Sequence, residues 1–360
     1  MRITKCVRKL EAYTPGEQPK AKNVVKLNTN ENPYPPSPKC AEVLQAFDLD
    51  RLRRYPDPEF SELRLALAKL NGTSPENVFV GNGSDEVLAL AAKAFVENDE
   101  QIGSLDPSYS LYKTLAAIRD VKWFGCNPLE RLEAMDILKR EGVSLFLWTN
   151  PNAPTGTFAS PAEIAAFARK FKGVVIVDEA YADFSKENCM QLATAAKNRN
   201  LIVMRTFSKS YSLAGLRVGY CVGPKDLIDA LYKVKDSYNV DAIAQAVALA
   251  AVKDQAWMKA NVAKVVKTRE WFTAELERRG WDVLPSESNF VFARPPAVAA
   301  SGKKTTVTRA GEIFSALRDR NIFVRYFRAP KTRDRIRVTI GTDIQMKKLL
   351  KALDELNLQS

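Results

Sequence analysis

Histidine is absent from all 360 residues of this chain. Its absence excludes catalytic triads that depend on an imidazole base and metal sites of the His-Glu-x-x-His type. Proton transfer at any active site must therefore use lysine, tyrosine, aspartate, glutamate or cysteine side chains.

Cysteine is scarce and scattered. The chain has five cysteines, an odd number, and none forms a Cys-x-x-Cys pair. This pattern argues against a disulfide framework and against a zinc site, and we predict no metal. We expect reduced, mostly buried thiols at Cys6, Cys40, Cys126, Cys189 and Cys221.

Long apolar runs are also missing. The longest, Ala242 to Val252, is interrupted by Gln245 and is too short to span a bilayer. The opening residues, MRITKCVRKL, contain no apolar run of signal-peptide length. We therefore expect a cytoplasmic protein with no membrane partner.

The net charge is +12, which raises the question of nucleic-acid binding. The lysines and arginines, however, are dispersed among acidic residues and form no long basic run or aromatic-interleaved stripe. We predict no nucleic-acid partner, and the charge favours phosphorylated or anionic small molecules.

The order of apolar and polar runs predicts an α/β protein. Residues 1–38, rich in proline, asparagine and lysine, are predicted to form an extended N-terminal arm. Between Pro56 and Val222 short β-rich runs alternate with helical patterns, which is typical of a wound, mostly parallel sheet. The predicted strands are Val78–Val80, Leu145–Trp148, Val174–Val177 and Leu201–Arg205, and the predicted helices are Asp85–Phe95 and Pro161–Phe171.

A helix-rich stretch, Pro224 to Arg279, precedes a tail of mixed character. The tail is expected to form a smaller α+β domain, so we divide the chain into an arm (1–38), a large domain (39–255) and a small domain (256–360). Its predicted elements are strands at Asn289–Ala293, Ile322–Tyr326 and Ile336–Ile340 and a helix near Gly311–Asp319.

Two residues follow the most apolar predicted strands. Asp178 comes directly after VVIV, and Lys209 follows LIVM by a short turn. Open α/β sheets bind ligands at the carboxyl ends of their strands, and a buried lysine can form Schiff bases. Taken singly, Asp178 could be a helix cap and Lys209 a surface residue.

The surrounding motifs decide between these interpretations. Their order and spacing resemble the aspartate-aminotransferase-like class, and in more detail the histidinol-phosphate aminotransferases, over essentially the full length. The motifs are NTNENPYPP (28–36), RYPD (54–57), GNGSDE (81–86), DPSY (106–109), NPNAPTG (150–156), VDEAYADF (177–184), TFSKSYSLAGLRVGY (206–220) and VRYF (324–327).

This resemblance implies pyridoxal 5'-phosphate as cofactor and the type I fold of the enzymes that use it, a mostly parallel sheet wrapped by helices. Lys209 would carry the cofactor as a Schiff base and shuttle the substrate proton. Asp178 would pair with the pyridine nitrogen and Tyr181 would donate to the ring 3'-oxygen. Tyr109 would stack on the ring, although alone it could be a core aromatic.

A phosphate site is suggested by GNGSDE itself. Gly83 permits close approach, and Ser84 and Asp85 open a helix whose free N–H groups attract anions, although a plain N-cap turn would look the same. The resemblance adds Thr206, Ser208 and Arg217 as phosphate ligands. It also implies that Tyr55 reaches the phosphate of a neighbouring subunit, and hence a homodimer with shared active sites.

The resemblance assigns substrate binding to two arginines and to the arm. Arg337 would bind the substrate anion with Arg325 beside it, and a guanidinium suits both a phosphate and a carboxylate. Asn30 and Glu31 would cover the substrate entrance, although residues this polar could equally belong to a solvated tail.

One departure from the family pattern stands in NPNAPTG. The family usually has asparagine immediately before the Pro-Thr-Gly, where it donates to the cofactor 3'-oxygen, and this chain has Ala153. Asn152 lies beside it and is counted among the cofactor-binding residues, but that donor role is not transferred to it.

The resemblance implies transamination of histidinol phosphate with glutamate and 2-oxoglutarate. Two enzyme alternatives stay open: an aromatic amino-acid aminotransferase of the same family and a pyridoxal-phosphate-dependent decarboxylase of threonine phosphate. A non-catalytic regulator on the same fold would not need Lys209.

Overall fold

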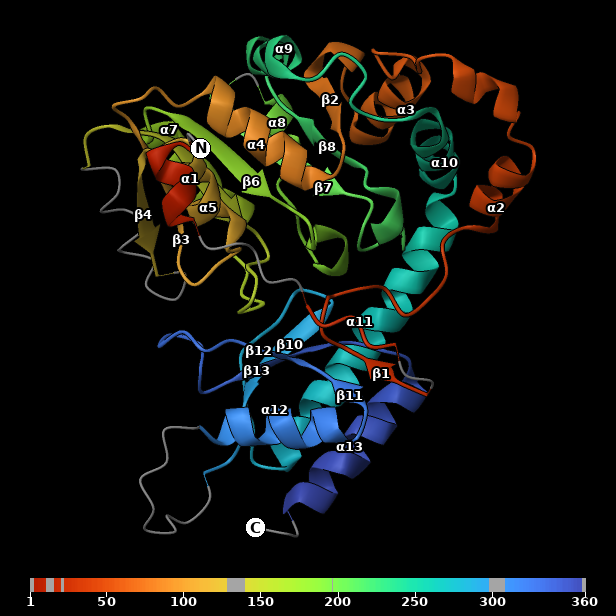
Figure 1. Ribbon diagram of the computed structural model, residues 1–360, viewed down its shortest axis with the longest axis vertical. Coiled ribbons are helices and arrows are strands. Elements are labelled where there is room, and N and C mark those ends of the chain that lie inside the picture. Colours follow the sequence, from red (N-terminus) through yellow and green to blue (C-terminus); the bar gives the residue numbers. More distant parts are fainter. Residues whose placement is uncertain are drawn as a thin grey trace.

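The computed structural model describes residues 3–10, 16–20, 23–127, 140–195, 197–297 and 308–357. Figure 1 shows a larger body built on a sheet and a smaller body beneath it, with the long helix α11 (Gln255–Arg278) running from one to the other. Within the described residues, no helix is long and apolar enough to cross a membrane.

The larger body is built on a seven-stranded sheet with the order β2-β8-β7-β6-β5-β3-β4. Strand β8 runs antiparallel to both of its neighbours, and every other pairing is parallel, which confirms the predicted mostly parallel sheet. The strands are β2 (Val78–Gly81), β3 (Gln101–Leu105), β4 (Lys122–Cys126), β5 (Val143–Thr149), β6 (Val174–Asp178), β7 (Leu201–Thr206) and β8 (Gly219–Val222).

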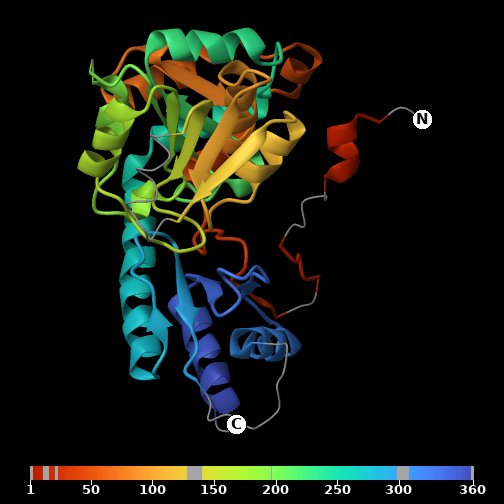
Figure 2. The same cartoon turned by 90° about the vertical axis from the view of Figure 1, so that its left-hand side faces the viewer.

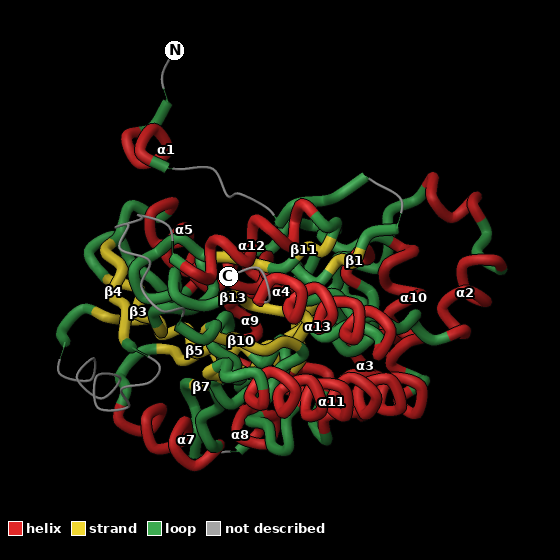
Figure 3. Tube along the Cα trace, turned by 90° about the horizontal axis from the view of Figure 1, so that it is seen from below, coloured by secondary structure: helices red, strands yellow, loops and turns green. Residues whose placement is uncertain are grey.

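Helices cover both faces of this sheet, which explains why β6 and β7 are apolar up to the polar residues at their carboxyl ends. Figure 3 shows α7 (Pro161–Lys170) and α8 (Met190–Thr194) along one side of the strands and α5 (Leu111–Ile118) along the other. Two separate apolar clusters fill the space on the two faces. The remaining helices of this body are α2 (Pro38–Gln45), α3 (Ser61–Asn71), α4 (Ser84–Ala94), α9 (Lys225–Val234) and α10 (Ala242–Val252), with a short 3-10 turn, η1 (Leu49–Arg53), between α2 and α3.

The smaller body is an antiparallel sheet of order β12-β13-β10-β9 with helices packed against it. Figures 1 and 2 show α13 alongside the lower part of α11. This body confirms the α+β character predicted for the tail. Its elements are β9 (Asp282–Val283), β10 (Phe290–Arg294), α12 (Arg309–Asp319), β11 (Ile322–Phe323), β12 (Arg325–Tyr326), β13 (Ile336–Thr339) and α13 (Asp343–Asn357).

The described part of the N-terminal arm contains α1 (Lys5–Lys9) and one strand. This strand, β1 (Val25–Lys26), pairs in parallel with β11 of the smaller body. The arm then continues toward the larger body, so it is tied to both. The proposed divisions at residues 38 and 255 stay predictions.

All five cysteines lie in the described residues, where none forms a disulfide, and all but Cys6 are buried. The described cysteine, aspartate and glutamate side chains form no cluster suited to a metal ion. The cysteines therefore have the reduced, mostly buried character that the sequence predicts.

Candidate active site

Three neighbouring parallel strands end in polar residues at one edge of the large sheet. Thr149 ends β5, Asp178 ends β6 and Thr206 ends β7. Carboxyl ends of parallel strands are where α/β folds bind ligands. The side chains around this edge come from four segments distant in sequence: the arm, α4, α5 and the turn after β7.

Asp178 is a buried carboxylate with two donors. It accepts hydrogen bonds from the Tyr112 hydroxyl at 2.7 Å and from the Ala180 N–H at 3.1 Å. Burial outweighs these bonds and raises the pKa of Asp178 to about 6. An aromatic ring nitrogen that carries a proton would supply the positive charge that such a carboxylate favours.

Tyr112 is a site residue that the sequence analysis missed. Its fully buried hydroxyl contacts the Thr149 hydroxyl at 2.5 Å as well as Asp178, and its ring packs edge-on against Tyr109 at 5.7 Å between centroids. Tyr109 and Tyr112 are one helical turn apart, and this spacing was the available signal. Tyr109 in turn donates to Asp85 at 3.1 Å, which joins the segment before α5 to the start of α4.

Lys209 lies in the turn after β7 and reaches toward the arm. Its Nζ donates to the Thr29 carbonyl oxygen at 3.3 Å and lies 5.8 Å from the centre of the Tyr181 ring. Burial, with the nearby positive charges of Arg337 and Arg217, lowers the pKa of Lys209 to about 8. A substantial fraction of the amine is therefore neutral near physiological pH, as nucleophilic chemistry requires.

Tyr181 is buried beside Lys209 and is held by the arm. Its hydroxyl accepts a 2.9 Å hydrogen bond from the Asn30 amide, whose own oxygen accepts from Thr339 at 3.0 Å. Burial raises the pKa of Tyr181, although Arg337 and Asn30 oppose the shift. Asn30 is thus part of the site wall, whereas Glu31 is more exposed and pairs with Lys26.

Residues suited to binding an anion meet at the start of α4, and we call this group the anion pocket. Gly83 precedes the helix with φ 80°, and no side chain caps the first turn. A Cβ on Gly83 would lie 2.7 Å from Nη2 of Arg217, so glycine keeps this space open. The helix N-terminus and the guanidinium both favour a phosphate here.

The opposite wall of the anion pocket is the turn from Thr206 to Arg217. The Ser208 N–H donates to the Thr206 hydroxyl oxygen at 3.1 Å, and Arg217 reaches Ser208 at 3.4 Å. Arg217 also lies 3.4 Å from Asp85 across the pocket. The structure thus brings together the six residues that the sequence assigned to a phosphate: Gly83, Ser84, Asp85, Thr206, Ser208 and Arg217.

The two predicted substrate arginines are direct cross-strand neighbours. Arg325 on β12 pairs in register with Arg337 on β13, and both guanidinium groups face the Phe327 ring at 5.4 and 5.3 Å. Arg337 also donates to the Asn28 carbonyl oxygen at 3.0 Å. Both positive charges come from the smaller body, and that of Arg337 acts on Lys209 and Tyr181.

Asn152 is committed to holding neighbouring loops. Its amide donates to the Pro107 carbonyl oxygen at 3.0 Å and to the Thr155 hydroxyl at 2.8 Å, while its oxygen accepts from Ser108 at 2.7 Å. Both amide hydrogens of Asn152 are therefore in use. This agrees with the decision not to give Asn152 the donor role that asparagine has at position 153 in the family.

Tyr55 lies apart from the other predicted residues. It is 80% exposed, and its ring stacks on Tyr238 with centroids 4.3 Å apart. Within one chain it therefore does not join the anion pocket.

These features fit the cofactor that the sequence resemblance implies. The glycine-lined anion pocket suits its phosphate, the buried carboxylate suits its ring nitrogen and Lys209 suits its aldehyde. The described residues thus contain a partner for each end of the molecule.

Comparisons with known proteins agree with this chemistry. The family model described as aminotransferase class I and II matches residues 22–353. The chain is 44% identical to a histidinol-phosphate aminotransferase of Geobacter sp. (strain M21) over 97% of both sequences. It is 43% identical to the enzyme of that name from Acetobacter pasteurianus, over 97% of this chain and 96% of that one.

A solved structure gives the same answer for the fold. The histidinol-phosphate aminotransferase of Sinorhizobium meliloti, solved in complex with pyridoxal 5'-phosphate, superposes with a TM-score of 0.87 at 26% identity, covering 98% of this chain and 97% of that one. The protein is therefore an aminotransferase and belongs to the histidinol-phosphate aminotransferase family.

Proposed function

We propose that this protein transfers the amino group between histidinol phosphate and 2-oxoglutarate, with pyridoxal 5'-phosphate as cofactor, in histidine biosynthesis. One observation carries the proposal: Lys209, the buried Asp178 and the anion pocket lie together at one edge of the large sheet. Relatives that share more than 40% of the sequence are named for this reaction.

The cofactor, when bound, supplies an electron-withdrawing ring that acidifies the substrate α-carbon and carries the amino group between half-reactions. The anion pocket would hold its phosphate, and Asp178 would keep its ring nitrogen protonated. Tyr112 supports this role because its hydrogen bond orients the Asp178 carboxylate. Tyr109 would cover the ring and Tyr181 would donate to the ring oxygen.

Lys209 is the proposed proton carrier. Its lowered pKa leaves Nζ partly unprotonated, so it can take the proton from the substrate α-carbon and give it up again. Its neighbours Arg337 and Arg217 favour the neutral amine. No imidazole is needed for this step, in agreement with a chain that contains no histidine.

Arg325 and Arg337 are proposed to bind the substrate anion. Their adjacent guanidinium groups can form paired hydrogen bonds with a phosphate in one half-reaction and with a carboxylate in the other. Asn30 and Glu31 would lie at the same side of the site. Two arginines side by side suit a doubly charged phosphate better than an uncharged aromatic side chain.

We further propose a homodimer whose active sites are shared. Tyr55 is highly exposed and belongs to a group of exposed apolar side chains on α2, η1, α3 and the segment after η1, a pattern typical of a covered surface. The group contains Leu44, Leu49, Leu52, Tyr55 and Leu65.

A cytoplasmic location is proposed because the described buried cysteines form no disulfide, as expected in a reducing compartment.

Initial-rate kinetics test the substrate assignment. Histidinol phosphate, phenylalanine and threonine phosphate are each supplied with 2-oxoglutarate, and glutamate and carbon dioxide are measured. We expect the highest kcat/KM with histidinol phosphate, and Arg337→Gln should raise KM for both histidinol phosphate and glutamate. A preference for phenylalanine, or carbon dioxide from threonine phosphate, would replace the proposal with one of the alternatives.

A subunit-mixing experiment tests the shared sites. Tyr55→Ala and Lys209→Ala chains are co-expressed with different tags, and the mixed dimers are purified. If Tyr55 serves the partner, each mixed dimer has one intact site and one site with both defects, so its activity exceeds the mean of the two parents. Activity equal to that mean, or a monomer by sedimentation, would contradict the dimer.

A further inference from the structure

A buried group of charged side chains lies on the side of the sheet opposite Asp178 and Thr206. The proposed reaction does not use these charges. Successive residues of a strand face opposite sides of a sheet. Asp178 and Thr206 turn toward the side of α4 and α5, whereas Glu179 and Arg205 turn to the other side. The Glu179 N–H donates to the Met204 carbonyl oxygen at 2.9 Å, so Glu179, directly after β6, lies beside Arg205 of β7.

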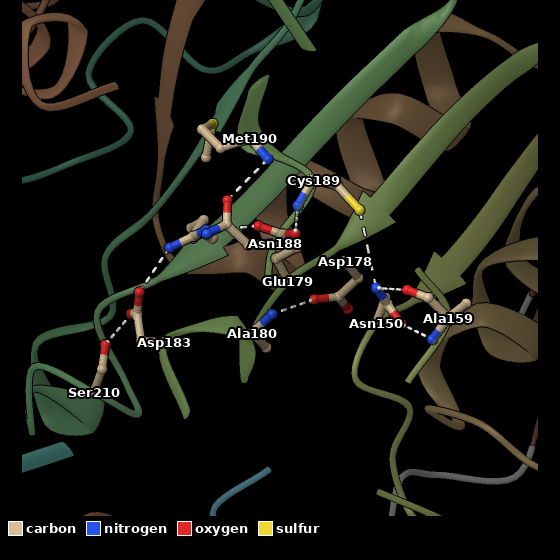
Figure 4. Close-up of polar contacts among 11 residues, drawn as sticks. Asn150, Ala159, Asp178, Glu179, Ala180, Asp183, Asn188, Cys189, Met190 and Ser210 are labelled. Carbon is tan, nitrogen blue, oxygen red and sulfur yellow. Dashed lines mark hydrogen bonds and ion pairs between the residues drawn. The ribbon is translucent and has the colours of Figure 1, made fainter. Parts of the chain in front are cut away.

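Arg205 binds two carboxylates from different segments. Its Nε and Nη2 donate to Glu179 Oε2 at 2.9 and 2.7 Å, and its Nη1 donates to Asp183 Oδ1 at 2.6 Å. The other oxygen of Asp183 accepts from the hydroxyl of Ser210, the residue that follows Lys209. Figure 4 shows Glu179, Asp183 and Ser210 at successive places in this chain of contacts, with Asp178 pointing away from Glu179.

These four residues, the Arg205 network, are strongly withdrawn from water. The Glu179 side chain is 0% exposed and that of Arg205 12% exposed. The two carboxylates hold the pKa of Arg205 above its usual value, so the guanidinium stays charged. Buried ion pairs add little net stability compared with apolar residues of similar volume, so stability alone does not account for them.

We propose that Arg205 is a positioning residue that sets the spacing between the ring end and the phosphate end of the cofactor site. Its bonds to Glu179 fix the end of β6, which carries Asp178, against the end of β7, which carries Thr206. Its link through Asp183 to Ser210 fixes the turn that carries Lys209. Arg205 thereby fixes the relative positions of Asp178, Thr206 and Lys209. These are the proposed partners of the cofactor ring nitrogen, phosphate and aldehyde.

The consequence concerns ligands that span the site. A molecule with both a ring and a phosphate gains affinity only if the two subsites are held at its own length, because the second contact is then intramolecular. A free phosphate ion needs only the anion pocket. Loosening the Arg205 network should therefore weaken the binding of a molecule that carries both the ring and the phosphate, and leave the binding of free phosphate nearly unchanged.

The test uses the full-length protein freed of cofactor, with pyridoxamine 5'-phosphate and inorganic phosphate as probes. Pyridoxamine 5'-phosphate has the ring and the phosphate but cannot link to Lys209, so it reports spacing alone. Binding is measured by calorimetry for wild type, Arg205→Lys and Asp183→Asn. Asp183→Asn keeps the buried Arg205–Glu179 pair, so it still tests the inference if Arg205→Lys does not fold.

The matched control is Arg279→Lys. Arg279 also binds two carboxylates, Asp354 at 2.7 Å and Glu275 at 2.6 Å, but it lies at the end of α11, in the smaller body. We expect the dissociation constant for pyridoxamine 5'-phosphate to rise by roughly tenfold or more in both network variants and by less than about twofold in the control. The constant for inorganic phosphate should change by less than about twofold in all three.

Equal losses for both probes would overturn the inference, because they would indicate general damage. Unchanged binding of pyridoxamine 5'-phosphate in the network variants would overturn it as well. The inference depends on the proposed cofactor, and that assignment is tested by wild type alone. If wild type binds pyridoxamine 5'-phosphate no more tightly than inorganic phosphate, the cofactor assignment fails.

Discussion

Asn30 donates a 2.9 Å hydrogen bond to the hydroxyl of Tyr181, a residue 151 positions further along the chain. Asn30 has a left-handed backbone with φ 55°, a conformation that asparagine tolerates better than most residues. Its side-chain oxygen accepts from Thr339 on β13. One amide therefore connects the arm, the loop after β6 and the smaller body at the active site.

Asn30→Gly removes this amide and keeps the left-handed backbone available. We expect it to lower the free energy of unfolding by about 1–3 kcal/mol, because the buried Tyr181 hydroxyl loses its donor and the Thr339 hydroxyl loses its acceptor, although Thr339 still accepts from the backbone N–H of residue 30. Asn23→Gly is the matched control, since Asn23 has φ 64° but is exposed. Urea denaturation compares the two variants, and equal losses would show that the amide contributes nothing specific.

Gly83→Ala should cripple cofactor binding without unfolding the protein. The new Cβ would lie 2.7 Å from Arg217 and push the guanidinium out of the anion pocket. Gly72→Ala also puts a side chain at positive φ, in the less strained αL region (ψ 38°, against 162° at Gly83), with nothing within 4 Å of the added Cβ. We expect the affinity for inorganic phosphate to fall roughly tenfold in Gly83→Ala only, the loss of one charge-assisted hydrogen bond. Calorimetry that finds the two variants alike would place the anion elsewhere.

Asp178→Asn should stabilise the cofactor-free protein while abolishing activity. The pKa of Asp178 is raised from 3.8 to about 6, so the folded state binds more protons than the unfolded state between these values, and stability falls as pH rises through them. Asparagine carries no charge, so the variant does not lose this stability. The loss in wild type reaches about 3 kcal/mol above pH 6, at about 1.36 kcal/mol per pKa unit.

Thermal unfolding of cofactor-free wild type and variant at pH 7.5 and pH 4 measures this difference. The gain should be present at pH 7.5 and absent near pH 4. Glu179→Gln, one residue further on, should have the opposite sign at pH 7.5. Burial raises the pKa of Glu179 as well, but the loss of its charge leaves the buried Arg205 guanidinium with Asp183 as its one remaining carboxylate among the described residues. A loss of stability in Asp178→Asn at pH 7.5 would contradict the raised pKa.

Local patterns predicted the centre of the fold well. The apolar runs of β6 and β7 indicated central strands covered on both faces, and they are neighbours in the middle of the sheet. Because ligands bind where such strands end, Asp178 and Lys209 were candidates from their position, and the resemblance carried by the surrounding motifs assigned their roles. The anion pocket was also foreseeable, since a glycine before a helix has a local physical meaning.

Other parts of the molecule depend on contacts that no local pattern reveals. Strand β3 contains Gly103 and Ser104, which weaken its strand signal, and β8 follows a long loop and runs against its neighbours. The arm strand β1 gains its partner nearly 300 residues later in the chain. The Arg205 network likewise depends on the register of two strands, so nothing in the sequence distinguishes its members from other polar and charged residues.

The amine of Lys209 should titrate near pH 8 in the cofactor-free protein. The rate of its acetylation by a small anhydride, followed by mass spectrometry, should rise through that pH, because only the neutral amine reacts. Arg337→Gln removes a positive neighbour and should move the midpoint to higher pH, whereas Arg325→Gln is the control and should move it less. A wild-type midpoint near the ordinary lysine value of 10.5 would contradict the buried site.

The most direct measurement of the central claim is a single half-reaction. The cofactor-loaded protein is mixed with histidinol phosphate alone, without any 2-oxo acid, and the released cofactor is identified by mass spectrometry. A transaminase predicts one pyridoxamine 5'-phosphate for each Lys209, formed together with one imidazole-acetol phosphate, and no conversion in Lys209→Ala. Cofactor that stays entirely in the aldehyde form with histidinol phosphate, and likewise with glutamate, would contradict the account.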